Sequence, residues 1–291
     1  MSGPRIHLAS YATPIFLPRQ WFLERSAIAN KVCDSATSWR PKDLTTAGFQ
    51  KRAPLISLSS RGSGYWAWKS FIIEHHLRDM PDGDILLYCD VGRRNDFKLL
   101  HQPLDPYLQW MEERGQDVMP GVRIPWKGPM SMWTKRDAFV LTEMDTPEAH
   151  GACPVQASFS LWRAGPQARR FAKKWMDWCA EPRLIGDERG SCGLPELEDF
   201  KDHRHDQSLL TLRCLQHGIE GLDLGLEMPA IDTQHPSEVS DWKFHTGSSG
   251  TPASGKLLHA AENLRLDREN RPQTGEDRLA RHHHEPSLPP A

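Results

Sequence analysis

The sequence lacks any hydrophobic run of transmembrane length and any pair of cysteines in a CxxC arrangement. A helix that spans a bilayer needs about 20 apolar residues. The first residues also lack the apolar stretch of a signal peptide, so we expect a cytoplasmic protein with at most a peripheral contact at the inner face of the membrane. The six cysteines are scattered, which indicates reduced thiols rather than a disulfide framework.

Neither sign of charge dominates, because 36 basic residues face 38 acidic ones. This balance gives no reason for a general attraction to nucleic acid, and we expect no nucleic-acid partner. Tyrosine is scarce, with four residues against 11 tryptophans. The flat indole face with its single donor suits both core packing and stacking on sugars. At 291 residues and 38% hydrophobic content, the chain has enough apolar material for one large domain.

The hydrophobic patterning predicts alternating strands and helices. Residues 84–90 form a nearly continuous apolar run, as in a strand that is buried on both faces. The other expected strands cover residues 5–12, 53–58 and 155–162, and the expected helices cover 18–30, 65–80, 166–181 and 206–217. This alternation predicts an α/β fold with a mostly parallel sheet flanked by helices. Ligands of such sheets bind beyond the carboxyl ends of the strands.

The composition changes near residue 250. A Ser- and Gly-rich linker leads into a polar, proline-rich segment, and one short helix is expected over 255–267. We therefore predict a single domain over residues 1–250 and a linker with a largely disordered tail over 251–291.

Asp90 is the first candidate site residue. It follows the apolar run over 84–90, whereas Asp82 and Asp84 precede it and lie at the opposite sheet edge. An aspartate in that position can hold a divalent cation or a ribose hydroxyl, and Gly92 lets the backbone approach a ligand. A turn residue or a helix cap explains Asp90 equally well.

The second candidate is the run RGSGYWAWK over residues 61–69. Arg61 and Lys69 can reach phosphate oxygens around a tight glycine turn, and Trp66 and Trp68 can form a pocket wall. The alternative is a surface turn that leads into a core helix.

The third candidate is HRHDQS over residues 203–208, directly before an expected helix. Asp206 and Gln207 can project into a site, or Asp206 and Ser208 can simply cap the helix. No second His or Cys cluster with metal-ligand spacing accompanies the two histidines, so a zinc site is not indicated. The later run RHHHE over 281–285 is best explained as a polar segment of the tail.

Several of these motifs together resemble a group of bacterial glycosyltransferases from capsule and lipopolysaccharide biosynthesis. RGSGYWAWKSFII and DGDILLYCDVG are similar to that group's RGYGYWIWKPYII and GDILLYLDAG. WTKRDAF at 133–139, VQASFSLWRAG at 155–165 and HRHDQSLLTL at 203–212 follow in the same order. The resemblance covers roughly residues 5–225.

The resemblance implies a GT-A fold that transfers a sugar from a nucleotide-diphosphate donor to a hydroxyl of a glycan or glycolipid. It implies Mn²⁺ or Mg²⁺ at Asp90. HDQS also resembles the DQ pair of retaining GT-A galactosyl- and glucosyltransferases, so we expect Asp206 to act as a base or as a stabiliser of the cationic sugar and Gln207 to position it. The donor site would comprise Arg61, Gly64, Tyr65, Trp66, Trp68, Lys69, Asp90 and Gly92, and the acceptor pocket Trp133, Gln156, Ser158 and His205.

Three departures from the group's pattern bear on these roles. Ser70 replaces a proline, Gln156 replaces a glutamate, and Gly92 stands where a DxD motif has its second aspartate. The missing ligand can come from a late histidine, for which His245 is the candidate, although a surface histidine is the simpler explanation. A non-catalytic nucleotide-sugar-binding protein and a metal-dependent nucleotide-sugar hydrolase remain as alternatives.

Overall fold

The computed structural model describes residues 3–92, 97–101, 103–223 and 231–234. These belong to one compact unit that spans Met1–His235. The expected domain boundary at residue 250, the short helix over 255–267, the tail and His245 all lie outside the described residues. Among the described helices, none is both long enough and apolar enough to cross a membrane.

The centre of the fold is a five-stranded sheet in the order β2-β1-β3-β6-β5. Its strands are β1 (Ile6–Tyr11), β2 (Ser35–Trp39), β3 (Ile85–Cys89), β5 (Val118–Met119) and β6 (Phe159–Arg163). β1 pairs in parallel with both β2 and β3, while β6 runs antiparallel to β3 and β5. Four of the five strands therefore share one direction, and the predicted α/β fold with a mostly parallel sheet flanked by helices is confirmed. A separate two-stranded sheet joins β4 (Phe97–Leu100) to β7 (Ile231–Gln234).

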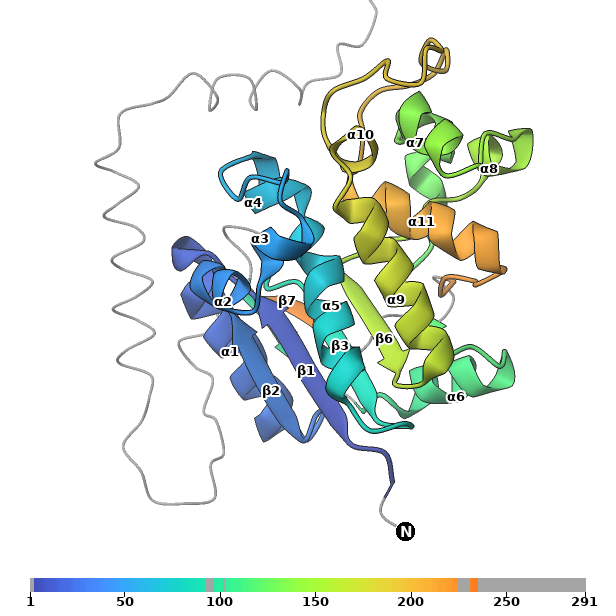
Figure 1. The fold of residues 1–291 in the computed structure, drawn as a ribbon. Coiled ribbons are helices and arrows are strands. Elements are labelled where there is room, and N and C mark those ends of the chain that lie inside the picture. The colour runs from blue at the N-terminus through green and yellow to red at the C-terminus, as the bar shows by residue number, and fades with distance from the viewer. Residues whose placement is uncertain (1–2, 93–96, 102, 224–230, 235–291) are drawn as a thin grey trace, which may run out of the picture. The chain divides into compact units, whose positions relative to one another are not determined.

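Helices cover the sheet on both faces (Figure 1). The longer ones are α1 (Leu17–Ala29), α5 (Ala67–Asp79), α6 (Asp105–Glu113), α9 (Pro166–Cys179) and α11 (Asp206–His217). The shorter ones are α2 (Pro41–Thr46), α3 (Phe49–Arg52), α4 (Arg61–Tyr65), α7 (Arg136–Leu141), α8 (Pro147–Gly151) and α10 (Pro182–Ile185). α5, α9 and α11 share a core with one face of the sheet, and α1 and α6 with the other.

Strand β3 supplies side chains to both cores. Leu86 and Tyr88 face α5 and α9, whereas Ile85, Leu87 and Cys89 face α1 and α6. Because alternate residues of a strand point to opposite faces, a central strand must be apolar throughout. This explains the continuous apolar run that identified β3 in the sequence.

The expected strand over 53–58 is wrong. Ala53 and Ile56 are buried, but Leu55 is 75% exposed and the segment forms turns. The missing strand is instead the polar segment Ser35–Trp39, which lies at the sheet edge beside β1. An edge strand tolerates polar residues because one of its sides stays open, so it leaves little hydrophobic signal in the sequence.

Candidate functional site

The register of β3 and β6 brings two chain segments together at one sheet edge. Cys89, the last residue of β3, pairs with Phe159, the first residue of the antiparallel β6. The Asp90 backbone N–H then donates to the carbonyl oxygen of Ser158 at 2.8 Å. Asp90 therefore lies at the carboxyl end of β3, as predicted, and the loop 156–158 runs beside it.

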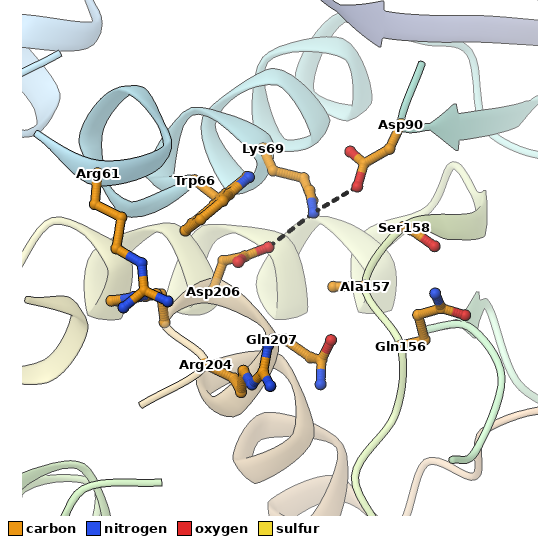
Figure 2. Close-up of a pocket in the computed structure, with 11 residues that line it drawn as sticks. Arg61, Trp66, Lys69, Asp90, Gln156, Ala157, Ser158, Arg204, Asp206 and Gln207 are labelled. Carbon is orange, nitrogen blue, oxygen red and sulfur yellow. Dashed lines mark hydrogen bonds and ion pairs between the residues drawn. The ribbon is translucent and has the colours of Figure 1, made fainter. Parts of the chain in front are cut away.

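A pocket of about 170 Å³ opens at this edge (Figure 2). A single water needs roughly 10–15 Å³ of such space, so the pocket has room for a much larger ligand. Its lining combines cations, carboxylates, amides and an indole: Arg61, Trp66, Lys69, Asp90, Gln156, Ala157, Ser158, Arg204, His205, Asp206 and Gln207. Three motifs that are far apart in the sequence therefore share one cavity.

Lys69 lies between two carboxylates of this pocket. Its Nζ is 2.9 Å from Oδ2 of Asp206 and 3.4 Å from Oδ2 of Asp90. The side chains of Lys69 and Asp206 are 4% and 6% exposed, whereas that of Asp90 is 28% exposed. Burial alone lowers the pKa of Lys69, but the carboxylates of Asp206 and Asp90 outweigh it, so its pKa ends above the ordinary value. The lysine therefore stays charged and holds both acids in place.

Asp206 occupies the first turn of α11, as predicted. Burial raises its pKa to about 6, although the ammonium of Lys69 opposes the rise. The start of α11 is fixed from a neighbouring helix, because the indole N–H of Trp175 in α9 donates to the Asp206 carbonyl at 3.2 Å. A carboxylate at this end of a helix is also favoured by the free backbone N–H groups of the first turn.

Asp90 has a second support that the sequence analysis missed. The hydroxyl of Tyr88 donates to Oδ1 of Asp90 at 2.7 Å. Burial and the nearby carboxylate raise the pKa of Tyr88 well above its ordinary value, so the hydroxyl keeps its proton. One tyrosine inside the apolar strand LLYCD was the signal that the sequence offered.

The turn that begins the RGSGYW motif is left-handed. Residues 62–66 all have positive φ, from 55° at Ser63 and Tyr65 to 95° at Gly64. Each L-residue in this region costs roughly 1–2 kcal/mol, and such local strain is common at functional sites. A Cβ at Gly62 would lie 2.5 Å from ring atoms of Trp66, so a side chain at this position would force the indole to move. The turn thereby places the Trp66 indole at the pocket.

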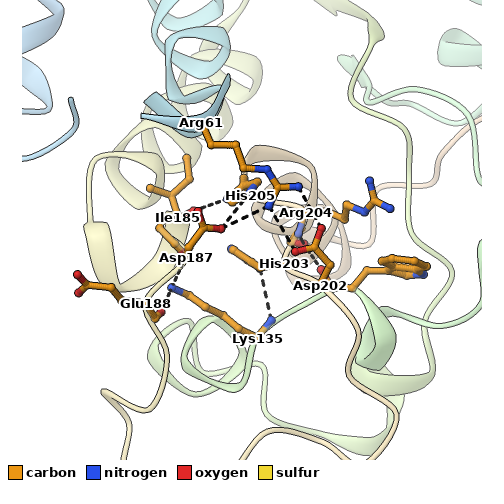
Figure 3. A network of polar contacts seen from close by, with 12 residues as sticks. Arg61, Lys135, Ile185, Asp187, Glu188, Asp202, His203, Arg204 and His205 are labelled. Atoms are coloured by element: carbon orange, nitrogen blue, oxygen red, sulfur yellow. Dashed lines mark hydrogen bonds and ion pairs between the residues drawn. The ribbon is translucent and has the colours of Figure 1, made fainter. Parts of the chain in front are cut away.

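Arg61 is already paired on the pocket's edge. Its guanidinium lies 3.1 Å from a carboxylate oxygen of Asp202 and 3.5 Å from one of Asp187 (Figure 3). These ion pairs link the RGSGYW turn to the segment that precedes α11.

His203 and His205 hold the chain around α10 rather than a metal ion. The Nε2–H of His203 donates to the Leu184 carbonyl at 2.8 Å, and the Nδ1–H of His205 donates to that of Ile185 at 2.7 Å (Figure 3). Burial lowers the pKa of both imidazoles. His205 lines the pocket, and its imidazole stacks on the Tyr65 ring with 5.1 Å between the ring centroids. The backbone of His205 has a φ of 49°, which is strained for a residue with a side chain.

Lys135 fixes the adjoining loop. Its ammonium donates to the carbonyl oxygens of Gly186 at 2.7 Å and Glu188 at 2.8 Å. Burial lowers the pKa of Lys135 to about 8. Lys135 of the WTKRD motif therefore has a structural role, because it holds the backbone of the loop that contains Gly186 and Glu188.

The other predicted site residues lie outside the pocket lining. Trp68 is buried, stacks on Tyr11 at 4.0 Å and donates its indole N–H to the Gly62 carbonyl. Gly64 precedes Lys69 in the chain and Gly92 follows Asp90, and both glycines have positive φ. Trp133 lies against Arg204, which lines the pocket and was not predicted.

Of the two aspartates that line the pocket, Asp90 is the more accessible to a divalent cation, with 28% of its side chain exposed against 6% for Asp206. No group of three or more His, Cys, Asp or Glu side chains with metal-binding proximity occurs within them. Mg²⁺ usually keeps several waters and binds through one or two carboxylates plus the phosphates of a substrate. The Asp90 oxygens are hard ligands of this kind, and they fit a cation that arrives with a diphosphate.

No family model and no curated protein matches the chain. Among solved structures, the chain is similar to core-mannan synthase A from Aspergillus fumigatus in its Mn/GDP form, with 10% identity and a TM-score of 0.39. The match covers 80% of this chain and 75% of the fungal one. A likeness this slight transfers no residue role and no ligand.

Proposed function

We propose that this protein is a glycosyltransferase that moves a sugar from a nucleotide-diphosphate donor to a hydroxyl of a glycan or glycolipid, in surface polysaccharide synthesis. The proposal rests on the sequence resemblance and on one observation: Lys69 joins Asp90 to Asp206 inside a single pocket. These residues come from three of the motifs that carry the resemblance. A merely structural ion pair would not need an open pocket beside it.

Glycosyl transfer passes through a positively charged, oxocarbenium-like sugar. Asp206 is the residue that can stabilise this charge, because a buried carboxylate acts through a low dielectric. Gln207 follows it on the same helical turn and lines the same pocket, where its amide can hold a sugar hydroxyl. Lys69 keeps the Asp206 side chain in place.

The departing nucleoside diphosphate needs positive charge beside it. Asp90 is partly exposed at the sheet edge and would hold a Mg²⁺ or Mn²⁺ ion that supplies this charge when the donor is bound. Tyr88 and Lys69 orient the carboxylate through its two oxygens. Gln156 and Ser158 line the pocket beside Asp90 and are the proposed contacts for the acceptor hydroxyl.

The test is product analysis with a panel of nucleotide sugars, with and without glycan acceptors. We expect a sugar to appear on the acceptor and a nucleoside diphosphate to be released. Asp206→Asn should lose about 10²–10⁴-fold in turnover, as is typical when a general base or charge-stabilising group is removed. Asp105→Asn is the matched control, because Asp105 also occupies the first turn of a helix but is exposed.

The same assay separates the alternatives. Donor cleavage that ignores every acceptor would indicate a nucleotide-sugar hydrolase. Donor binding without any turnover would indicate a binding protein. Either result would overturn the transferase proposal.

A further inference from the structure

Two cations lie against the ring of Trp133 at the edge of the pocket. The Arg204 guanidinium carbon is 4.5 Å from the ring centroid, and Nζ of Lys201 is 5.9 Å from it. The indole N–H donates to the Lys127 carbonyl at 2.7 Å, which fixes the ring in turn. We refer to Trp133, Lys201 and Arg204 as the basic shelf.

The backbone holds the basic shelf together. Backbone N–H groups of Lys201 and Arg204 donate to the carbonyls of Met132 and Trp133 at 2.9 and 3.0 Å. The Ser208 hydroxyl donates to the same Trp133 carbonyl at 2.7 Å and ties the shelf to α11. Arg204 is thus positioned before any ligand arrives, which lowers the entropic cost of binding.

Arg204 interacts with the Asp202 carboxylate only at longer range: its charge contributes, after that of Arg61, to lowering the pKa of Asp202. Within the described part of the chain, neither Arg204 nor Lys201 forms an ion pair, and Asp202 between them is paired with Arg61. Two like charges beside one ring repel each other, and a bound anion relieves that repulsion. The other cations that line the pocket, Lys69 and Arg61, are each held by two carboxylates.

Arg204 of the basic shelf lies apart from the proposed donor end. In Figure 2, Asp90, where the donor diphosphate is proposed to bind, lies above Asp206, whereas Arg204 lies below it beside Gln207. An anion on the shelf would therefore belong to the second substrate. Arg204 also lines the same pocket as Asp206, so a sugar held by the shelf is close to the proposed reaction centre.

We propose that the basic shelf binds an acidic sugar, one that carries a phosphate or a carboxylate, as the acceptor. The role of this sugar as the acceptor rests on the proposed function, whereas the binding site for an acidic sugar does not depend on it. The Trp133 ring packs on the sugar or orients the guanidinium, and Arg204 forms charge-assisted hydrogen bonds to the anionic group. Lys201 adds a more distant positive charge.

Ligand-observed NMR tests the inference without donor or turnover. We expect the wild-type protein to bind glucose 6-phosphate and glucuronate about tenfold more tightly than glucose, the range of one charge-assisted hydrogen bond. Arg204→Gln should remove this preference, and Lys201→Gln should reduce it. Arg114→Gln is the matched control, since Arg114 also stacks on a tryptophan, Trp110, at 4.4 Å. It should keep the preference.

Three results would overturn the inference. One is an unchanged preference in Arg204→Gln. Another is equally tight binding of inorganic phosphate and glucose 6-phosphate, which would show that the sugar adds nothing. The third is a tenfold loss of UDP or GDP affinity in Arg204→Gln, which would assign Arg204 to the donor. If wild type shows the preference but transfers no sugar, the proposed function fails and the acidic-sugar site stands.

Discussion

Nζ of Lys69 lies 2.9 Å from Oδ2 of Asp206, and both side chains are almost fully buried. Lys69 comes from the first turn of α5 and Asp206 from the first turn of α11, more than 130 residues later in the chain. A buried ion pair with one partner removed leaves an uncompensated charge, which is costly.

Lys69→Met should therefore lower the free energy of unfolding by about 3–5 kcal/mol, measured by urea denaturation. Adding Asp206→Asn should recover part of that loss, with a coupling of roughly 1–3 kcal/mol. Lys42→Met, on the exposed side of α2, should change stability by less than about 0.5 kcal/mol. Strict additivity of the two pocket substitutions would mean that the pair does not interact.

The rate should depend on pH through Asp206. Its pKa is raised to about 6, and only the ionised carboxylate can stabilise a cationic sugar. We expect kcat/KM to rise with pH through about 6 and then level off. The residual activity of Asp206→Asn should lack this limb, and a limb that persists in the variant would assign it to another group.

Stability should show the opposite trend from the same group. Because the folded-state pKa of Asp206 exceeds its ordinary value of 3.8, the folded protein binds more protons than the unfolded one between about pH 4 and 6. Ionisation of Asp206 therefore removes stability as the pH rises through this window. Between about pH 4 and 6, the plot of melting temperature against pH should have a different slope for wild type than for Asp206→Asn. The same slope for both proteins would contradict the raised pKa of Asp206.

Removal of divalent cations should stop turnover. EDTA should abolish activity, and added Mn²⁺ or Mg²⁺ should restore it, since the cation that Asp90 would hold is proposed to supply positive charge for the departing diphosphate. Asp90→Asn should lose at least about 100-fold in turnover with the fold intact. Asp82→Asn is the control from the other end of β3, where Asp82 pairs with Arg169. Undiminished turnover in EDTA would exclude the cation.

Gly62→Ala should disturb donor binding through Trp66. The new methyl group would meet the Trp66 ring at 2.5 Å. Gly115→Ala separates this clash from backbone strain, because Gly115 has a similar φ of 60° and no atom within 4 Å of its Cβ position. We expect the control to cost about 1 kcal/mol and to leave the donor KM unchanged. Equal effects of the two substitutions would mean that Trp66 plays no part.

The local elements of the site were readable from the sequence. The apolar run before Asp90 predicted β3 and placed Asp90 at the carboxyl edge. The spacing after residue 206 and the glycine at 218 predicted α11, which ends at His217 with Gly218 in the left-handed conformation. These signals are local, because a strand or helix buries its own apolar face and ends at residues that favour its termini.

Only the tertiary structure decided what the charged residues do. The sequence presented Lys69 and Arg61 as free cations for phosphate, whereas the fold pairs each of them with two carboxylates. The sequence did not indicate that Arg204 lines the pocket or that the hydroxyl of Tyr88 holds Asp90. Helix propensity and hydrophobic period fix which residues form an element, but partners between elements depend on long-range packing. The charge of the pocket is therefore a property of how α5, α11 and β3 meet.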